Sequence, residues 1–139
     1  MGIRAKVKAN RDLKHHLWED VGITIGEEIK DKIKNKQIAR FGNSIMPMDD
    51  ALVLVSVDLS RPYLNFQTDI DEEEPGFEIT LVREFLRSLS RTLDATIHVQ
   101  KLSGINSHHI IEAVFKGIGV ALGEAVSESD RLESTKGVL

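Results

Sequence analysis

The chain has 139 residues, of which 41% are hydrophobic and 29% are charged. That length fits one domain and that composition can form a hydrophobic core, so a largely disordered chain is excluded. The net charge of −4 with dispersed basic residues argues against a nucleic-acid partner, and the lack of a long apolar run or signal peptide leads us to expect a soluble, cytoplasmic protein without a membrane partner.

Hydrophobic periodicity predicts a mixture of strands and helices. Segments in which every second residue is apolar are typical of half-buried strands, and an apolar residue every three or four positions is typical of amphipathic helices. In chain order we expect a strand at 3–9, a helix from 15 to about 34, strands at 37–46, 51–59 and 62–68, a helix at 79–93, a strand at 95–102 and a helix from 107 to about 125. Turns are expected at 46–50 and 71–76, and a polar loop from Val126 onward. Because strands and helices do not alternate strictly, this order favours an α+β fold with a largely antiparallel sheet.

The chain contains two copies of a His-His-x-x-Glu motif. They are His15, His16 and Glu19 and, 93 positions later, His108, His109 and Glu112. Five histidines placed at random would give roughly 0.2 adjacent pairs, so two pairs that are each followed by Glu at the same offset are not explained by chance. Gly26 and Gly119 are separated by the same 93 positions. The sequence therefore predicts an internal duplication.

The motif suits metal binding when it lies in the first turn of a helix. Its Glu then shares a helix face with both histidines, whereas the adjacent rings diverge by about 100° around the axis, so each pair is better suited to two metal ions than to one. The chain has no cysteine, and imidazole with carboxylate ligands favours Mn, Fe, Co, Ni or Zn. The fifth histidine, His98, is expected in the strand before the second motif. The alternative is that these are solvated polar residues at helix starts, which explains a single pair but explains the repeat poorly.

Several further segments complete a pattern that resembles a known enzyme family. They are Arg40-Phe41-Gly42, Pro47-Met48-Asp49, Asp58-Leu59-Ser60-Arg61-Pro62-Tyr63-Leu64, Asn106-Ser107, Phe115-Lys116 and Ser134-Thr135-Lys136-Gly137. Together with the two histidine motifs, they make essentially the whole chain similar to the imidazoleglycerol-phosphate dehydratases of histidine biosynthesis. The resemblance implies a duplicated α+β half-domain of the ribosomal protein S5 domain 2-like type, with antiparallel-rich sheets packed on helices.

The chain departs from the pattern of this family in a few places. The pattern begins upstream of Met1, with a further strand and a helix that carries another metal-binding histidine. We therefore expect a single domain with a shortened first half-repeat at 1–50 and a second half-repeat at 51–139. Arg11-Asp12-Leu13 stands where the family has Gly-Asp-Leu, no glycine separates Ser60 from Arg61, and Asp50 stands where the family has Glu.

The resemblance also implies which residues form the site. Metal ligands of the family fall at His15, His16, Glu19, His98, His108, His109 and Glu112, and two Mn²⁺ ions are expected per active site. Residues around the substrate phosphate fall at Arg40, Arg61, Lys116, Ser134 and Lys136. Guanidinium and ammonium groups are suited to a phosphate ester. Active sites are expected where subunits meet, in a homo-oligomeric shell of about 24 subunits.

The activity that the resemblance implies is that of a lyase, which removes water from D-erythro-imidazole-glycerol phosphate to give imidazole-acetol phosphate. The reaction breaks a weakly acidic C–H bond beside the imidazole ring, and a metal bound to a ring nitrogen can stabilise the negative charge that develops. A base must take the proton, and Glu19 is the candidate. The alternative is a non-catalytic relative that forms a shell or binds metal and phosphate without turnover.

Overall fold

The computed structural model describes residue 6 and residues 14–70 and 78–129. These contain three helices, α1 (Lys14–Ile33), α2 (Ile79–Leu93) and α3 (Ser107–Ala125), and four strands, β1 (Phe41–Met48), β2 (Ala51–Asp58), β3 (Tyr63–Gln67) and β4 (Thr96–Ser103). None of the described helices is both long and apolar enough to cross a membrane. The strand expected at 3–9, the turn at 71–76 and most of the C-terminal tail lie outside the described residues.

The four strands form one mixed sheet in the order β1-β2-β4-β3. The pairs β1/β2 and β2/β4 are antiparallel, while β3 and β4 are parallel. The parallel pair follows from its connection, because α2 lies between β3 and β4 in the chain and a helix returns the chain to the same end of the sheet. The expected α+β fold with a largely antiparallel sheet is therefore confirmed.

The first hairpin differs from its prediction. The sequence predicts a strand at 37–46 followed by a turn at 46–50, whereas β1 begins at Phe41 and runs to Met48, and only Asp49 and Asp50 form the turn. The sequence places Pro47 in a turn because proline lacks the N–H group that a strand donates to its neighbour. β1 is an edge strand, however, and has a neighbouring strand on one side only, so a proline there need not break a hydrogen bond of the sheet. Position in the sheet, which the local sequence does not show, explains the difference.

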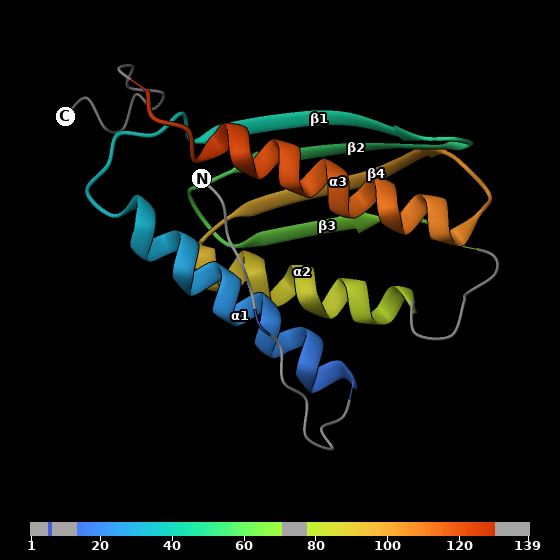
Figure 1. Ribbon diagram of the computed structural model, residues 1–139, viewed down its shortest axis with the longest axis horizontal. Helices are drawn as coiled ribbons and strands as arrows, with labels where there is room; N and C mark the ends of the chain where they lie inside the picture. Colours follow the sequence, from blue (N-terminus) through green and yellow to red (C-terminus); the bar gives the residue numbers. More distant parts are fainter. Residues whose placement is uncertain (1–5, 7–13, 71–77, 130–139) are drawn as a thin grey trace.

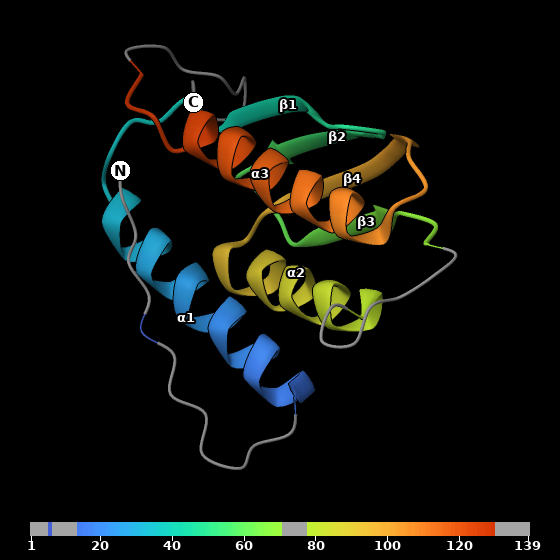
Figure 2. The same ribbon diagram turned by 45° about the vertical axis from the view of Figure 1, so that its right-hand side comes forward.

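All three helices lie on one face of the sheet (Figures 1 and 2). Along β2, residues Val53, Val55 and Val57 are buried and alternate with partly exposed residues that point to the other face. Helix α3 packs closely on β1 and β2 because Gly117 leaves room for Val55, and the Ser44 hydroxyl donates to the Gly117 carbonyl over 2.9 Å. The core thus lies between the sheet and the helices.

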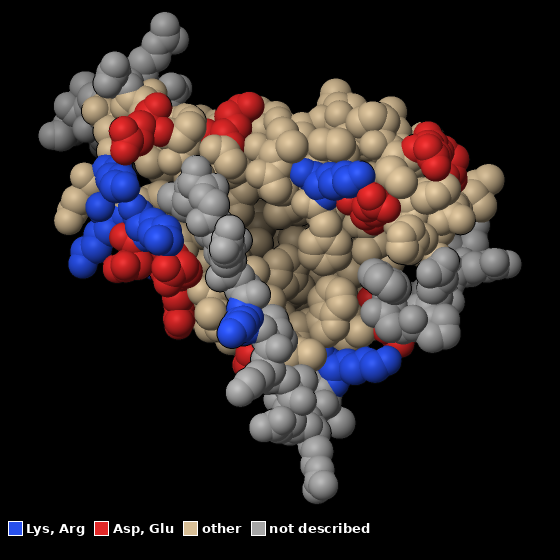
Figure 3. Space-filling view, viewed as in Figure 1, with Lys and Arg blue, Asp and Glu red and all other residues tan. Residues whose placement is uncertain are grey.

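Helix α1 packs on α2 instead of on the sheet, and Gly22 and Gly26 face Ser88 and Thr92 at this contact. An apolar cleft of about 400 Å³ opens where α1, α2 and α3 meet. Its walls are Leu17, Trp18, Val21, Ile25, Phe85 and Phe115. Figure 3 shows a central hollow on this side of the molecule that is walled mainly by uncharged side chains.

Candidate functional site

Both histidine motifs lie in the first turns of helices, as the sequence predicts. His15 is the second residue of α1 and His108 is the second residue of α3. Asn106 caps α3, since its side chain accepts a hydrogen bond from the His109 N–H over 3.0 Å and so satisfies a donor at the helix start. The side chain of His15 lies outside what the structure describes.

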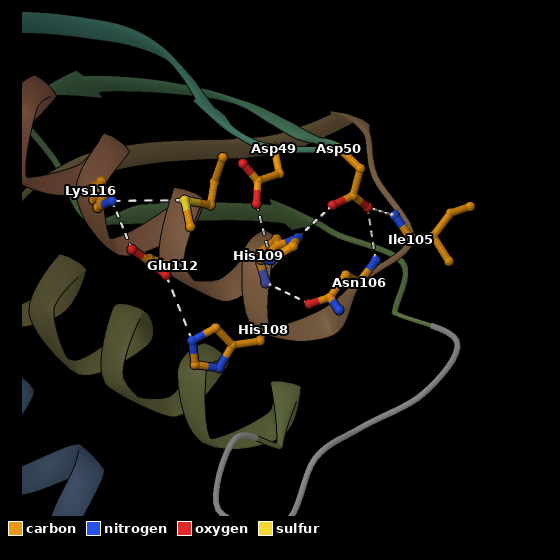
Figure 4. Close-up of polar contacts among 9 residues, drawn as sticks. Asp49, Asp50, Ile105, Asn106, His108, His109, Glu112 and Lys116 are labelled. Carbon is orange, nitrogen blue, oxygen red and sulfur yellow. Dashed lines mark hydrogen bonds and ion pairs between the residues drawn. The ribbon is translucent and has the colours of Figure 1, made fainter.

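The two rings of the second motif point to different sides of α3 (Figure 4). His108 Nε2 lies 3.7 Å from an oxygen of Glu112, one helical turn further on. His109 instead faces the turn between β1 and β2, with Nδ1 2.6 Å from Asp50 and Nε2 3.4 Å from Asp49. The expected divergence of adjacent rings is therefore present, and the two imidazoles have different acidic neighbours.

Asp50 is the most strongly held carboxylate of this cluster. One oxygen contacts His109, and the other accepts the backbone N–H groups of Ile105 and Asn106 at 2.7 and 3.0 Å. The Ile105 and Asn106 N–H groups, and then His109, lower the pKa of Asp50 far below its usual range. In turn, the hydrogen bond to Asp50 and the charges of Asp49, Asp50 and Glu112 raise the pKa of His109.

Glu112 is held between His108 and Lys116. Lys116 Nζ lies 2.7 Å from Glu112 Oε1, one turn along α3, and 3.9 Å from the Met48 sulfur. The hydrogen bond from Lys116, more than any other contact, lowers the pKa of Glu112. Glu112 is thus ionised and oriented, as a metal-binding carboxylate must be. Lys116, expected at the substrate phosphate, contacts Glu112 within the chain.

The remaining expected ligands lie apart from this cluster. His16 is exposed and Glu19 half-buried at the start of α1. His98 lies on the face of the sheet opposite to the helices, where its ring contacts Tyr63 at a centroid distance of 5.6 Å. Among residues 14–70 and 78–129, no three His, Asp or Glu side chains converge as a complete metal site.

The donors nevertheless fit a divalent transition metal. The second motif supplies imidazole nitrogens and an ionised carboxylate, no thiolate competes because the chain has no cysteine, and His109 is oriented by a carboxylate on its Nδ1. Within the described residues, each cluster provides only part of a coordination shell.

The residues expected around phosphate form two groups. Arg40 makes two hydrogen bonds to Asp58, at 2.7 and 3.2 Å, and the exposed Arg61 acts electrostatically on the same carboxylate. Lys116 lies at the other end of β1, beside Met48, and the eight residues of that strand span about 23 Å. Ser134 and Lys136 lie outside the described residues. One chain therefore does not gather Arg40 and Lys116 around a single anion.

Comparison with known proteins decides the family. Residues 1–122 match the model of the family described as imidazoleglycerol-phosphate dehydratase. The enzyme of that name from Pyrococcus furiosus is 56% identical over 140 residues, which is 100% of this chain and 79% of the relative. The chain belongs to the imidazoleglycerol-phosphate dehydratase family. A second enzyme of that name, from Acetivibrio thermocellus, is 49% identical, and the alignment covers 96% of this chain and 73% of the relative.

Solved structures of imidazoleglycerol-phosphate dehydratases share the fold. The crystal structure of the P. furiosus protein in complex with (S)-C348 has a TM-score of 0.87 and 59% sequence identity, over 94% of this chain and 74% of that chain. The Staphylococcus aureus dehydratase has a TM-score of 0.81 and 41% identity, over 88% and 72% of the two chains. Members of this family are dehydratases of histidine biosynthesis, so the chain is classed as a lyase.

Three residues that contact the second histidine motif are not assigned to the candidate site by sequence reasoning. Asp49 appears only within an expected turn and a segment that carries the resemblance, Asn106 only within such a segment, and Asp50 only within the turn and as a departure from the family pattern, so none of the three has an expected role in a site. Two adjacent carboxylates at a hairpin turn are a signal that the sequence contains. Asp50, however, lies 59 positions before His109 in the chain. Only the packing of α3 on the β1–β2 hairpin reveals that they are neighbours.

Proposed function

We propose that the chain dehydrates D-erythro-imidazole-glycerol phosphate to imidazole-acetol phosphate, and that it uses a dinuclear His/Glu site that binds two Mn²⁺ ions. The observation that carries the proposal is the match to a dehydratase across the whole chain, which includes both histidine motifs. The geometry of α3 supports it, because His109 and Glu112 each have a second polar partner that fixes their orientation.

The chain's own residues have distinct roles in this proposal. His108, His109 and Glu112 would serve as metal ligands, and Asp50 and Lys116 hold the His109 and Glu112 side chains in place. A divalent metal bound to a ring nitrogen of the substrate would supply stabilisation of the negative charge that develops when the C–H proton leaves. Glu19, half-buried in the first turns of α1, is the proposed base that takes this proton.

The complete site is proposed to lie between subunits. The clusters on α1, β4 and α3 supply separate parts of the ligand set, and none is complete within the described part of one chain. A homo-oligomeric shell of about 24 subunits would bring ligands from different copies together. Ile45 and Tyr63, which are 63% and 56% exposed on the sheet face away from the helices, provide apolar surface for such contacts.

The proposed phosphate site also draws on more than one subunit. Arg40 and Arg61 lie near one end of the sheet and Lys116 near the other. The proposal therefore combines Arg40 and Arg61 of one copy with Lys116 of another. Ser134 and Lys136 complete the proposed set. Bidentate guanidinium contacts and an ammonium group would neutralise the phosphate and orient the substrate.

A dehydratase assay on the purified protein, with metal analysis, tests the proposal. Addition of Mn²⁺ to metal-free protein should produce imidazole-acetol phosphate at a rate that saturates with metal, and light scattering at micromolar protein should report a large oligomer. Metal uptake and assembly without turnover would instead indicate the non-catalytic alternative. A monomer that takes up no metal would overturn the inter-subunit site.

A further inference from the structure

The β1–β2 turn is joined to the start of α3 through one side chain. Asp50 contacts the ring of His109 with one carboxylate oxygen, over 2.6 Å, and the backbone N–H groups of Ile105 and Asn106 with the other. Figure 4 shows the carboxylate between these three donors. The contacts therefore connect a hairpin turn, the loop before α3 and the first turn of α3.

We propose that Asp50 is a positioning residue that fixes His109 as the tautomer protonated at Nδ1 and so leaves the lone pair of Nε2 for a metal ion. This inference rests on the proposed function, in which His109 is a metal ligand. Asp50 itself would not touch the metal or the substrate.

The chemistry of the two groups sets the tautomer. An ionised carboxylate only accepts hydrogen bonds, so a contact of 2.6 Å to Nδ1 requires the proton to lie on Nδ1. The neutral imidazole then carries its lone pair on Nε2, the atom that can bind a metal. Rotation of the carboxylate away from the ring would break its bonds to Ile105 and Asn106, which makes the orientation rigid.

The surroundings of Nε2 agree with a cation there. Asp49 Oδ2 lies 3.4 Å from His109 Nε2, and the Asp49 side chain is 71% exposed. A cation at Nε2 would therefore meet a second carboxylate that can move at little cost. Asp50 and Asp49 contact the two different nitrogens of the His109 ring. Asp50 is therefore expected to orient the ring, and Asp49 is expected to lie beside a cation at Nε2.

The substitution Asp50→Asn separates positioning from a merely structural role. The amide oxygen can still accept the Ile105 and Asn106 N–H groups, so the loop before α3 should be retained. The amide NH₂ would then face the ring and donate to Nδ1, which forces the ring proton onto Nε2. Asp50→Glu keeps a carboxylate and serves as the conservative rescue, and Asp69→Asn, an exposed aspartate elsewhere, serves as the control.

Two measurements test the inference on the whole 139-residue chain. The first is a two-bond ¹H–¹⁵N spectrum of metal-free, histidine-labelled protein at about pH 9, where an ordinary imidazole is neutral, with the His109 signals assigned by their loss in His109→Ala. The second is the dissociation constant for Mn²⁺ by calorimetry. We expect protonation at Nδ1 in the wild type and at Nε2 in Asp50→Asn, with Mn²⁺ affinity lowered about 10- to 100-fold.

The controls separate the possible outcomes. Asp50→Glu should retain the Nδ1-protonated ring and recover part of the affinity, and Asp69→Asn should match the wild type. In a His109→Ala background, Asp50→Asn should change the affinity by less than about twofold, because its partner is gone. Unchanged tautomer and affinity in Asp50→Asn would overturn the inference and leave the proposed function standing. A wild type that binds no Mn²⁺ would overturn the proposed metal site, and the NMR result would still report on the tautomer.

Discussion

Arg40 and Asp58 form a two-point ion pair across the end of the first hairpin, with nitrogen–oxygen distances of 2.7 and 3.2 Å. Each side chain is 27% exposed, and the Ser60 hydroxyl donates to the same carboxylate over 2.8 Å. The backbone at Arg40 is fixed as well, because its N–H group bonds the Ala125 carbonyl and its own carbonyl accepts the Leu59 N–H. The ion pair therefore orients the Arg40 side chain through its Nε and Nη2 atoms, and the third guanidinium nitrogen, Nη1, makes neither of the two bonds to Asp58.

The ion pair should make stability depend on pH through Asp58. Burial raises the pKa of Asp58, but the hydrogen bonds from Arg40 and Ser60 outweigh it and the pKa is lowered. The carboxylate thus contributes stability above its unfolded pKa of about 4, and this contribution is lost as the pH falls through the lower folded value. Asp58→Asn should lower the free energy of unfolding by about 1–2 kcal/mol at pH 7, and urea titrations should show the difference from wild type shrinking below about pH 4. A constant difference down to pH 2 would contradict this account.

The repeated glycines provide a matched test of packing. A Cβ atom on Gly26 would lie 2.8 Å from Thr92 Cβ at the α1–α2 contact, whereas one on Gly119 would meet nothing within 4 Å among the described residues. Gly26→Ala should therefore destabilise the fold by about 1–3 kcal/mol, and Gly119→Ala should leave stability unchanged or raise it by up to about 1 kcal/mol. Chemical unfolding measures both. Equal effects of the two substitutions would show that α1 does not pack on α2 as described.

Local periodicity predicts the secondary structure well, because each described element has a clear apolar pattern. Both ends of α2 agree with the prediction, and the predicted helix at 15–34 differs from α1 by one residue at each end. The error at the C-terminal end of β1 arises from Pro47, whose effect depends on the strand's position at the sheet edge. The parallel pairing of β3 with β4 is likewise a property of the whole sheet. Boundaries that depend on neighbours in space were therefore the ones that local patterns could not predict.

The candidate site also combines features that the local sequence predicts with features that depend on tertiary packing. The first-turn location of both histidine motifs follows from local sequence, and the structure confirms it. The placement of His98 away from the motifs does not follow, because it depends on which face of β4 the helices cover. The contact of Asp50 with His109 depends on the docking of α3 against the hairpin. Whether the ligands assemble between subunits stays a prediction.

Glu112 should be essential for metal binding. Its carboxylate lies between His108 and Lys116, and the charge of Lys116 keeps it ionised. Glu112→Gln removes this charge at nearly constant size, so Mn²⁺ affinity should fall about 10- to 100-fold, with a comparable or larger loss of turnover. Glu124→Gln, an exposed glutamate near the other end of α3, is the control. Calorimetry that finds equal Mn²⁺ affinity in the two variants would remove Glu112 from the ligand set.

Arg61 should contribute to substrate binding more than to the chemical step. Its side chain is exposed, and its backbone carbonyl accepts a hydrogen bond from the Thr96 hydroxyl over 2.8 Å, so truncation of the side chain should leave the chain in place. A phosphate remote from the reacting carbon is bound about equally in the ground state and the transition state, and loss of such a contact raises KM with little change in kcat.

Steady-state kinetics of Arg61→Ala should therefore show a KM raised about tenfold with kcat within about threefold of wild type, whereas Glu112→Ala should lose turnover because a metal ligand is gone. Arg87→Ala is the matched control, since Arg87 is also exposed and forms an ion pair with Glu84, one turn earlier on α2. An unchanged KM in Arg61→Ala would place the phosphate elsewhere. Equal residual activity in Arg61→Ala and Glu112→Ala would reject the division between phosphate binding and metal binding, and would favour a non-catalytic role for these residues.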